Sequence, residues 1–267
     1  MVNFIVAAAL AAAMPSALPP EQKAAPAMFV VRDPDTTVYI FGTFHALDGQ
    51  THWFSDNIRN AFEQSNELVL ETVIPEQPQM IHAGPGFRPP SVTPSASFLA
   101  TTRMAINAGR SQGMQVGNGA DMVLRHVAEA EGKSVEGLET LQFQLDMFNR
   151  MPATTSAPPP APQAKPGQQA DGNQMESLSK AMAEMQAAWK RGDHSVFVRM
   201  LDQLRANSPD TYRMMFTERN DRWADWIRAR MQTPGTVFVA VGAGHLAGQD
   251  SLLVRLAERG IPSHRVN

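Results

Sequence analysis

Short apolar runs alternate with amphipathic stretches over the first part of the chain. Two apolar runs within residues 28–47 flank the turn residues Asp33-Pro34-Asp35 and predict a β-hairpin. Residues 55–66 carry apolar positions at helical spacing, and the apolar run 67–71 predicts a strand that ends in Glu71. Strands and helices that alternate in this order are typical of an α/β fold.

Helical spacing dominates the later part of the chain. A short strand is predicted at 134–139 and a helix at 141–150, and residues 209–231 predict one long helix. An apolar run from Phe238 predicts a strand, and a helix follows at about 250–259. We therefore predict a central mixed or mostly parallel sheet flanked by helices, with a helical insertion in the C-terminal part.

Three segments depart from this pattern. Residues 1–26 begin with small apolar residues and then turn polar, which predicts a signal peptide or disordered leader and a periplasmic or secreted protein. Six prolines interrupt residues 75–97 and predict a long loop. Residues 151–173 are Pro/Ala/Gln-rich, too poor in large side chains to form a core, and are predicted to be a disordered insertion. Residues 27–267 are predicted to form one domain.

Composition narrows the classes of function. The net charge of -3 and the lack of a basic face or tail argue against a nucleic-acid partner. The absence of cysteine excludes disulfides and thiolate catalysis. Beyond the N-terminus, no segment approaches the roughly 20 apolar residues of a membrane span, so we expect no stable span.

One short pattern occurs twice. The run 38–45 ends in Gly42-Thr43-Phe44-His45, and the run 238–245 ends in Gly242-Ala243-Gly244-His245. Groups that leave the carboxyl ends of parallel strands meet in one crevice, so we expect both histidines in one site. Glycine at the strand exit lets the backbone turn sharply beside whatever is bound.

Charged residues extend the predicted site. The strand 67–71 ends in Glu71, which we expect at the same sheet edge as His45 if the two strands are parallel neighbours. In the predicted helix 209–231, Arg219 and Asn220 fall on the apolar face, where a guanidinium needs an anionic partner or a wet cleft. We expect a shaping role for Gly42, Glu139, Gly242 and Gly244.

These motifs together carry a family resemblance. The two exit motifs, Leu68-Val69-Leu70-Glu71, Gly137-Leu138-Glu139-Thr140, and Arg219-Asn220 with Trp223 occur in the order typical of the TraB/GumN family, which includes the TIKI metalloproteases. The chain resembles this family from about Ala27 to its end, apart from the two Pro-rich segments.

The resemblance implies a site made of His45, Glu71 and His245, and in the TIKI branch this set is associated with metal-dependent peptide hydrolysis. Such a set can hold a divalent ion such as Mn, Co or Zn and leave positions open for water, whose pKa the ion lowers. Arg219 would stabilise a developing oxyanion, and Asn220 would orient a ligand or the substrate. The implied partner is a peptide or small acyl substrate.

Three alternatives stand beside this hypothesis. A more distant resemblance to erythromycin-esterase-like proteins allows a metal-free mechanism with His45 as general base. The same cleft could bind and sequester a peptide or signal molecule without turnover. Arg219 could also be a structural ion-pair partner of Glu139 or Glu71. Both catalytic versions require His45 and His245 to lie within about 10 Å of each other, on one face of the sheet.

Overall fold

The computed structural model describes residues 23–74, 96–151 and 170–267. The predicted leader up to residue 22, the Pro-rich loop from 75 to 95 and the low-complexity residues 152–169 lie outside the described residues. Residues 24–26, which we assigned to the leader, belong to the fold: Ala24 is buried, and the Ala25 N–H donates to the Lys190 carbonyl at 2.7 Å.

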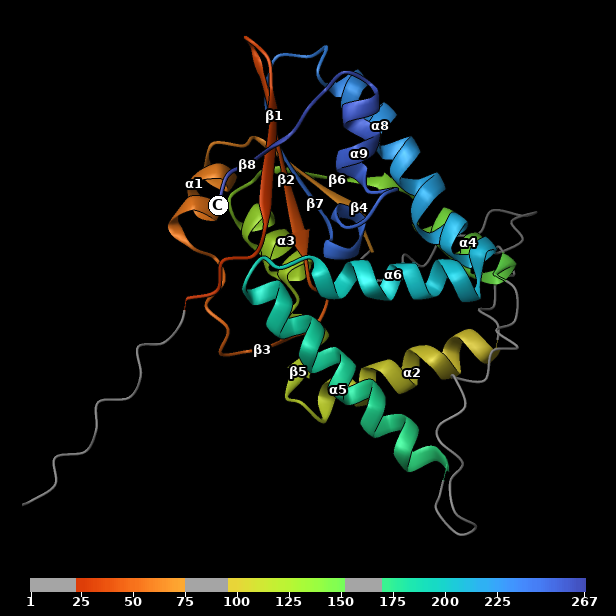
Figure 1. The fold of residues 1–267 in the computed structure, drawn as a ribbon. Coiled ribbons are helices and arrows are strands. Elements are labelled where there is room, and N and C mark those ends of the chain that lie inside the picture. The colour runs from red at the N-terminus through yellow and green to blue at the C-terminus, as the bar shows by residue number, and fades with distance from the viewer. Residues whose placement is uncertain (1–22, 75–95, 152–169) are drawn as a thin grey trace, which may run out of the picture.

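The main sheet of the described chain has the strand order β6-β4-β7-β2-β1-β8 (Figure 1). The strands are β1 Met28–Arg32, β2 Thr36–Thr43, β4 Glu67–Thr72, β6 Ser134–Glu139, β7 Gly235–Gly242 and β8 His264–Arg265. The pairs β2/β7, β7/β4 and β4/β6 are parallel, whereas β1 pairs antiparallel with β2 and β8. The predicted α/β class with a mixed, mostly parallel sheet is confirmed.

The strand order shows how the strands that carry the first motif and Glu71 are related. β2 and β4 are parallel but are not neighbours, because β7 lies between them. Residues Val237 to Gly242 of β7 are all buried, as expected for a central strand covered on both faces. The second Gly-x-x-His motif therefore leaves the sheet between the exit of β2 and the exit of β4.

Helices cover both faces of the sheet. The helices are α1 Asp56–Glu63, α2 Ala96–Arg110, α3 Ala120–Ala130, α4 Leu141–Arg150, α5 Ala170–Lys190, α6 Ser195–Asn207, α7 Pro209–Tyr212, α8 Glu218–Arg230 and α9 Leu252–Glu258. In Figure 1, α8 and α9, in blue, lie on one side of the strands, and α1 and α3 lie on the other. Strands β3 (Leu47–Asp48) and β5 (Met114–Gln115) form a small separate sheet.

Alternate residues of the strands feed two separate hydrophobic clusters. Phe41, Leu70 and Phe238 pack with α1, α3 and Trp189 of α5. Val69 and Val239 pack on the opposite face with α8 and α9. Each face therefore has its own layer of helices, which holds the strand exits at one edge in register.

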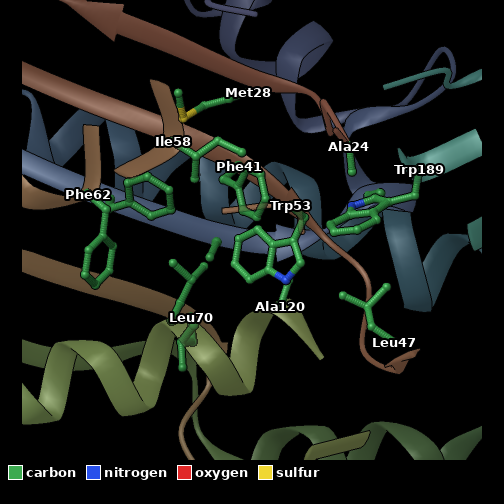
Figure 2. Packing of buried hydrophobic residues seen from close by; sticks show 14 of the residues in the cluster. Ala24, Met28, Phe41, Leu47, Trp53, Ile58, Phe62, Leu70, Ala120 and Trp189 are labelled. Carbon is green, nitrogen blue, oxygen red and sulfur yellow. The ribbon is translucent and has the colours of Figure 1, made fainter. Parts of the chain in front are cut away.

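The first cluster is rich in aromatic rings. Figure 2 shows Phe41, Trp53 and Trp189 packed together, and the Phe41 and Trp53 rings are stacked at 5.5 Å between centroids. The Trp189 Nε1–H also donates to the Gly42 carbonyl at 2.7 Å. This buried bond fastens α5, which belongs to the helical insertion, to the end of β2, next to the first motif.

The helices differ from the predictions in two boundaries and one interruption. α2 starts at Ala96 and α5 at Ala170, so the ends of the predicted loop 75–97 and insertion 151–173 are helical. The predicted single helix 209–231 is interrupted by a π-helical segment, Arg213–Thr217, between α7 and α8. A π-turn widens the hydrogen-bonded ring by one residue and is frequent at functional sites. Short 3₁₀ turns at Val116–Asn118 and Ala243–Leu246 complete the described elements.

None of the helices in the described ranges combines the length and the apolar character needed to cross a bilayer.

Candidate functional site

The carboxyl ends of β2, β4 and β7 bring the predicted residues together. His45 follows β2 by two residues, Glu71 lies near the end of β4, and His245 lies in the 3₁₀ turn after β7. A Cβ added to Gly242 would stand 3.1 Å from Glu71 Oε1, 3.2 Å from His45 Nε2 and 3.8 Å from His245 Cδ2. Both imidazoles and the carboxylate thus lie within 4 Å of one point, so the two motifs meet as the sequence predicts.

A side chain at residue 242 would crowd these three groups, and glycine leaves room for them. Gly242 has an ordinary extended backbone (φ -53°, ψ 136°), so conformation does not demand glycine there. The need is for space, because a methyl group would press on the Glu71 carboxylate and the His45 ring. At Gly244 the neighbour is the ring of Phe216, at 3.3 Å, and at Gly42 it is Leu246, at 3.2 Å.

Arg219 joins the acidic groups of the site. Its Nη2–H donates to Glu71 Oε2 at 2.6 Å, and its Nε–H donates to Glu139 Oε2 at 2.9 Å. Its Nη1 lies 3.2 Å from His245 Nε2, and the guanidinium stacks over Trp223 at 4.6 Å. Arg219 is 4% exposed, so its inward direction agrees with the helical periodicity and its charge is paired on both sides.

Glu139 is mainly part of this ion-pair network. It is buried, and besides Arg219 it accepts a hydrogen bond from Arg222 Nη2 at 3.1 Å. Both structural pairings considered for Arg219 in the sequence are therefore present in the structure.

Glu71 is held as a carboxylate. Burial raises its pKa, but Arg219, the two histidines and the Gly242 N–H lower it more strongly, so the pKa lies well below its usual range. The Gly242 N–H donates to Oε1 at 2.7 Å. Glu71 therefore carries a full negative charge at neutral pH.

His245 is buried and neutral. Burial lowers its pKa, and Arg219 and His45 lower it further against the opposing effect of Glu71, to about 3. Its ring lies between Phe216 and Trp223, with centroids at 4.9 Å and 4.4 Å. Nδ1 lies 2.7 Å from Asn220 Oδ1, so Asn220 contacts a site residue directly.

His45 has different surroundings from His245. Its side chain is 60% exposed, and Nδ1 lies 3.3 Å from Asp121 Oδ1. Enclosure by the chain lowers its pKa, but the close contact with Asp121 and the charges of Asp121 and Glu71 outweigh this and raise the pKa to about 9. Solvent around the exposed ring weakens each of these effects.

Sequence reasoning missed Asp121, Arg222 and Gly119. Asp121 lies in the first turn of α3, where an acidic residue is ordinary because it favours the helix dipole. Its Oδ1 is buried and has no hydrogen-bond partner of good geometry among the described residues, yet it lies beside His45. A Cβ at Gly119 would collide with the His45 carbonyl, so this glycine lets α3 approach the first motif. No motif marks these residues in the sequence.

The histidine partners resemble the supporting shell of a metal site. A metal-bound histidine usually donates its second N–H to a carboxylate or carbonyl oxygen, and here Nδ1 of His45 lies against Asp121 and Nδ1 of His245 against Asn220. The donors His45 Nε2, Glu71 Oε1 and His245 Nε2 therefore fit a divalent cation in their chemistry.

One donor separation can be compared with that of a bound ion, whose ligands lie roughly 3 to 4 Å apart. Glu71 Oε1 and His245 Nε2 lie 3.7 Å apart, and no three His, Asp or Glu side chains of residues 23–74, 96–151 and 170–267 form a ready-made metal-binding group. An ion on this set would compete with Arg219 for the His245 lone pair.

Comparison with known proteins gives one match. No curated protein and no solved structure matches the chain significantly. The model of the TraB/PrgY/gumN family matches residues 27–88 and 89–265, a span that contains all the site residues described above. The chain therefore belongs to the TraB/PrgY/gumN family.

Proposed function

We propose that the protein hydrolyses peptide or other acyl bonds at the site formed by His45, Glu71 and His245, with a divalent metal ion as cofactor. One observation carries the proposal: two imidazoles and a carboxylate converge beside Gly242, at the carboxyl edge of the parallel strands. Ligands in open α/β sheets bind at this edge. A bound divalent ion would be held by these three residues and would supply a water of lowered pKa.

The three site residues Glu71, His45 and His245 have different properties that suit different roles in the reaction. Glu71 keeps its charge because Arg219 and the Gly242 N–H bind its two oxygens. His45 is the most exposed group of the set and can exchange a proton with solvent at Nε2. His245 stays fixed and neutral between two aromatic rings.

Arg219 has limited freedom to stabilise an oxyanion. Nε and Nη1 already donate to Glu139, Met215 and His245, and one N–H of Nη2 donates to Glu71. Only the second N–H of Nη2 lacks an acceptor among the described residues. A substrate oxygen would take that N–H or replace one of the existing contacts.

One observation favours a metal-free version of the same reaction. The His245 lone pair already faces a permanent cation, because Arg219 Nη1 lies 3.2 Å from Nε2. In this version the neutral form of His45, which becomes more populated as the pH rises toward its raised pKa of about 9, takes a proton from water at Nε2 while the water oxygen bonds to the acyl carbon. The proton then passes to the leaving alkoxide or amine as the C–O or C–N bond breaks, and Asp121 stabilises the imidazolium formed in between.

The decisive experiment measures metal content and hydrolysis together. Purified protein is assayed on peptide and ester panels, with and without a chelator, beside His45→Ala and the matched control His126→Ala on the exposed face of α3. We expect bound divalent metal, and activity that both the chelator and His45→Ala abolish. Activity that survives chelation would select the metal-free version. A protein that binds no metal and is inert on all panels would refute both.

Export is part of the same proposal. The buried Ala24 and the bond from Ala25 to the Lys190 carbonyl require any processing to leave residue 24 in place. N-terminal sequencing of protein recovered outside the cytoplasm should find a mature chain that begins at or before Ala24. A chain recovered only in the cytoplasm with its first residues intact would contradict this.

A further inference from the structure

The hydrogen bonds around Asn220 determine which ring nitrogen of His245 carries the proton. Asn220 Nδ2 lies 2.7 Å from the carbonyl oxygen of Asp250. A carbonyl only accepts, so the NH₂ group of Asn220 must face Asp250. The oxygen Oδ1 then faces His245 Nδ1, at 2.7 Å, and because an amide oxygen only accepts, Nδ1 must carry the hydrogen.

The opposite side of the ring leads to the same result. His245 Nε2 lies 3.2 Å from Arg219 Nη1, and a guanidinium only donates. Nε2 must therefore present its lone pair. The other tautomer, with hydrogen on Nε2, would point an N–H at Arg219 and leave Asn220 Oδ1 without a donor.

We propose that Asn220 is a positioning residue that holds His245 in the Nδ1–H tautomer, and that the Asp250 carbonyl holds Asn220. Without Asn220 only the Arg219 contact would favour a lone pair on Nε2, and Glu71 Oε1, a strong acceptor 3.7 Å from Nε2, would compete by favouring a hydrogen there. Asn220 thus keeps the Nε2 lone pair available beside Glu71, where Arg219 Nη1 donates to it and where a cation could replace that contact.

Asp250 is itself tied to the surrounding helices. Its Oδ2 accepts from the Tyr212 hydroxyl at 2.9 Å, and its Oδ1 accepts from Arg255. Tyr212 ends α7 and Arg255 lies in α9, so two helices fix the carbonyl that orients Asn220. The path from these helices to His245 runs through hydrogen bonds of defined direction. The inference about the tautomer holds whether or not the protein is an enzyme. A role of the tautomer in catalysis rests on the proposed function.

The test observes the tautomer directly. Nitrogen NMR of histidine-labelled full-length protein, with the His245 signals assigned by His245→Gln, shows which ring nitrogen is protonated. We expect Nδ1–H in the natural protein. In Asn220→Ala we expect that preference to be weakened and Nε2–H to become populated, because only Arg219 still favours the Nε2 lone pair. Asn220→Asp keeps an acceptor at Nδ1 and should retain Nδ1–H.

Asp225→Asn on the exposed face of α8 is the matched control and should leave the His245 signals unchanged. A natural protein with hydrogen on Nε2, or an Asn220→Ala protein that keeps Nδ1–H fully, would overturn the inference. If Asn220→Ala does not fold, the natural protein and Asn220→Asp still decide it. An inert protein with the Nδ1–H tautomer would refute only the proposed function, and an active protein with Nε2–H would refute only this inference.

Discussion

The two Gly-x-x-His motifs share their first glycine and their histidine, but the surroundings of the two histidines differ. His45 is 60% exposed and pairs with a carboxylate, whereas His245 is buried, accepts from Arg219 and pairs with an amide. Their pKa values move in opposite directions, to about 9 for His45 and about 3 for His245. Neighbours from other elements therefore assign the roles: His45 can gain and lose a proton, while His245 presents a fixed lone pair.

The largest loss of folding stability is expected from Arg219→Ala, because Arg219 contacts His245 of the second motif and pairs with two buried carboxylates. Arg219→Ala leaves the Glu71 and Glu139 carboxylates without their central cation, and removing one partner of a buried pair costs about 3–5 kcal/mol. Arg222→Ala is the control, because its side chain is 45% exposed and an exposed pair contributes about 0–1 kcal/mol. Urea denaturation measures both changes, and equal losses in the two variants would contradict the central role of Arg219.

Alanine variants of the two histidines should differ in folding stability, although both should lose activity under the proposed function. His245→Ala removes a ring packed between Phe216 and Trp223 and should destabilise the fold by about 2–4 kcal/mol, as large-to-small core changes do. His45→Ala alters an exposed side chain and should stay within about 0.5 kcal/mol. Thermal unfolding checks the contrast, which fails if His45→Ala proves the more destabilising change. Under the proposed function both variants lose activity.

Substitution of the first glycine should affect activity in the second motif (Gly242) and folding stability in the first motif (Gly42). In Gly242→Ala the new methyl meets Glu71 and His45, so activity should fall about 10²-fold through misplaced groups, with little loss of stability. In Gly42→Ala the methyl meets Leu246 and Ala243, and overpacking should cost about 1–3 kcal/mol. Kinetics and urea denaturation on the two variants test this. A Gly242→Ala protein with full activity would show that the space at residue 242 is not used.

The smallest effect concerns His194, a half-buried histidine outside the site. His194 packs against Phe29, and burial, with Arg265 adding to it and Asp193 opposing it, lowers its pKa below the usual 6.5. As the pH falls through about 6.5 the unfolded chain takes up this proton first, so folding stability should fall by at most about 1.4 kcal/mol per pH unit. The slope between pH 7 and 5 should be shallower in His194→Gln, and identical slopes would show that His194 is not the cause.

Local patterns in the sequence were sufficient for much of the fold. The hairpin, α1, the strand ending at Glu71 and the inward direction of Arg219 and Asn220 follow from periodicities of two and 3.6 residues, which depend on each segment alone. The convergence of the two motifs also followed, because parallel strands deliver their carboxyl ends to one edge.

The sequence by itself thus determined the elements, the edge of the sheet and the main candidates for chemistry. Only the tertiary structure decided that β7 lies between β2 and β4, that Asp121 faces His45, and that Asn220 stands between Asp250 and His245. Strand order and side-chain pairing depend on how distant segments pack, and no periodicity within one segment records its partner. For that reason two copies of one motif could be found in the sequence, while the difference between them became visible only in the fold.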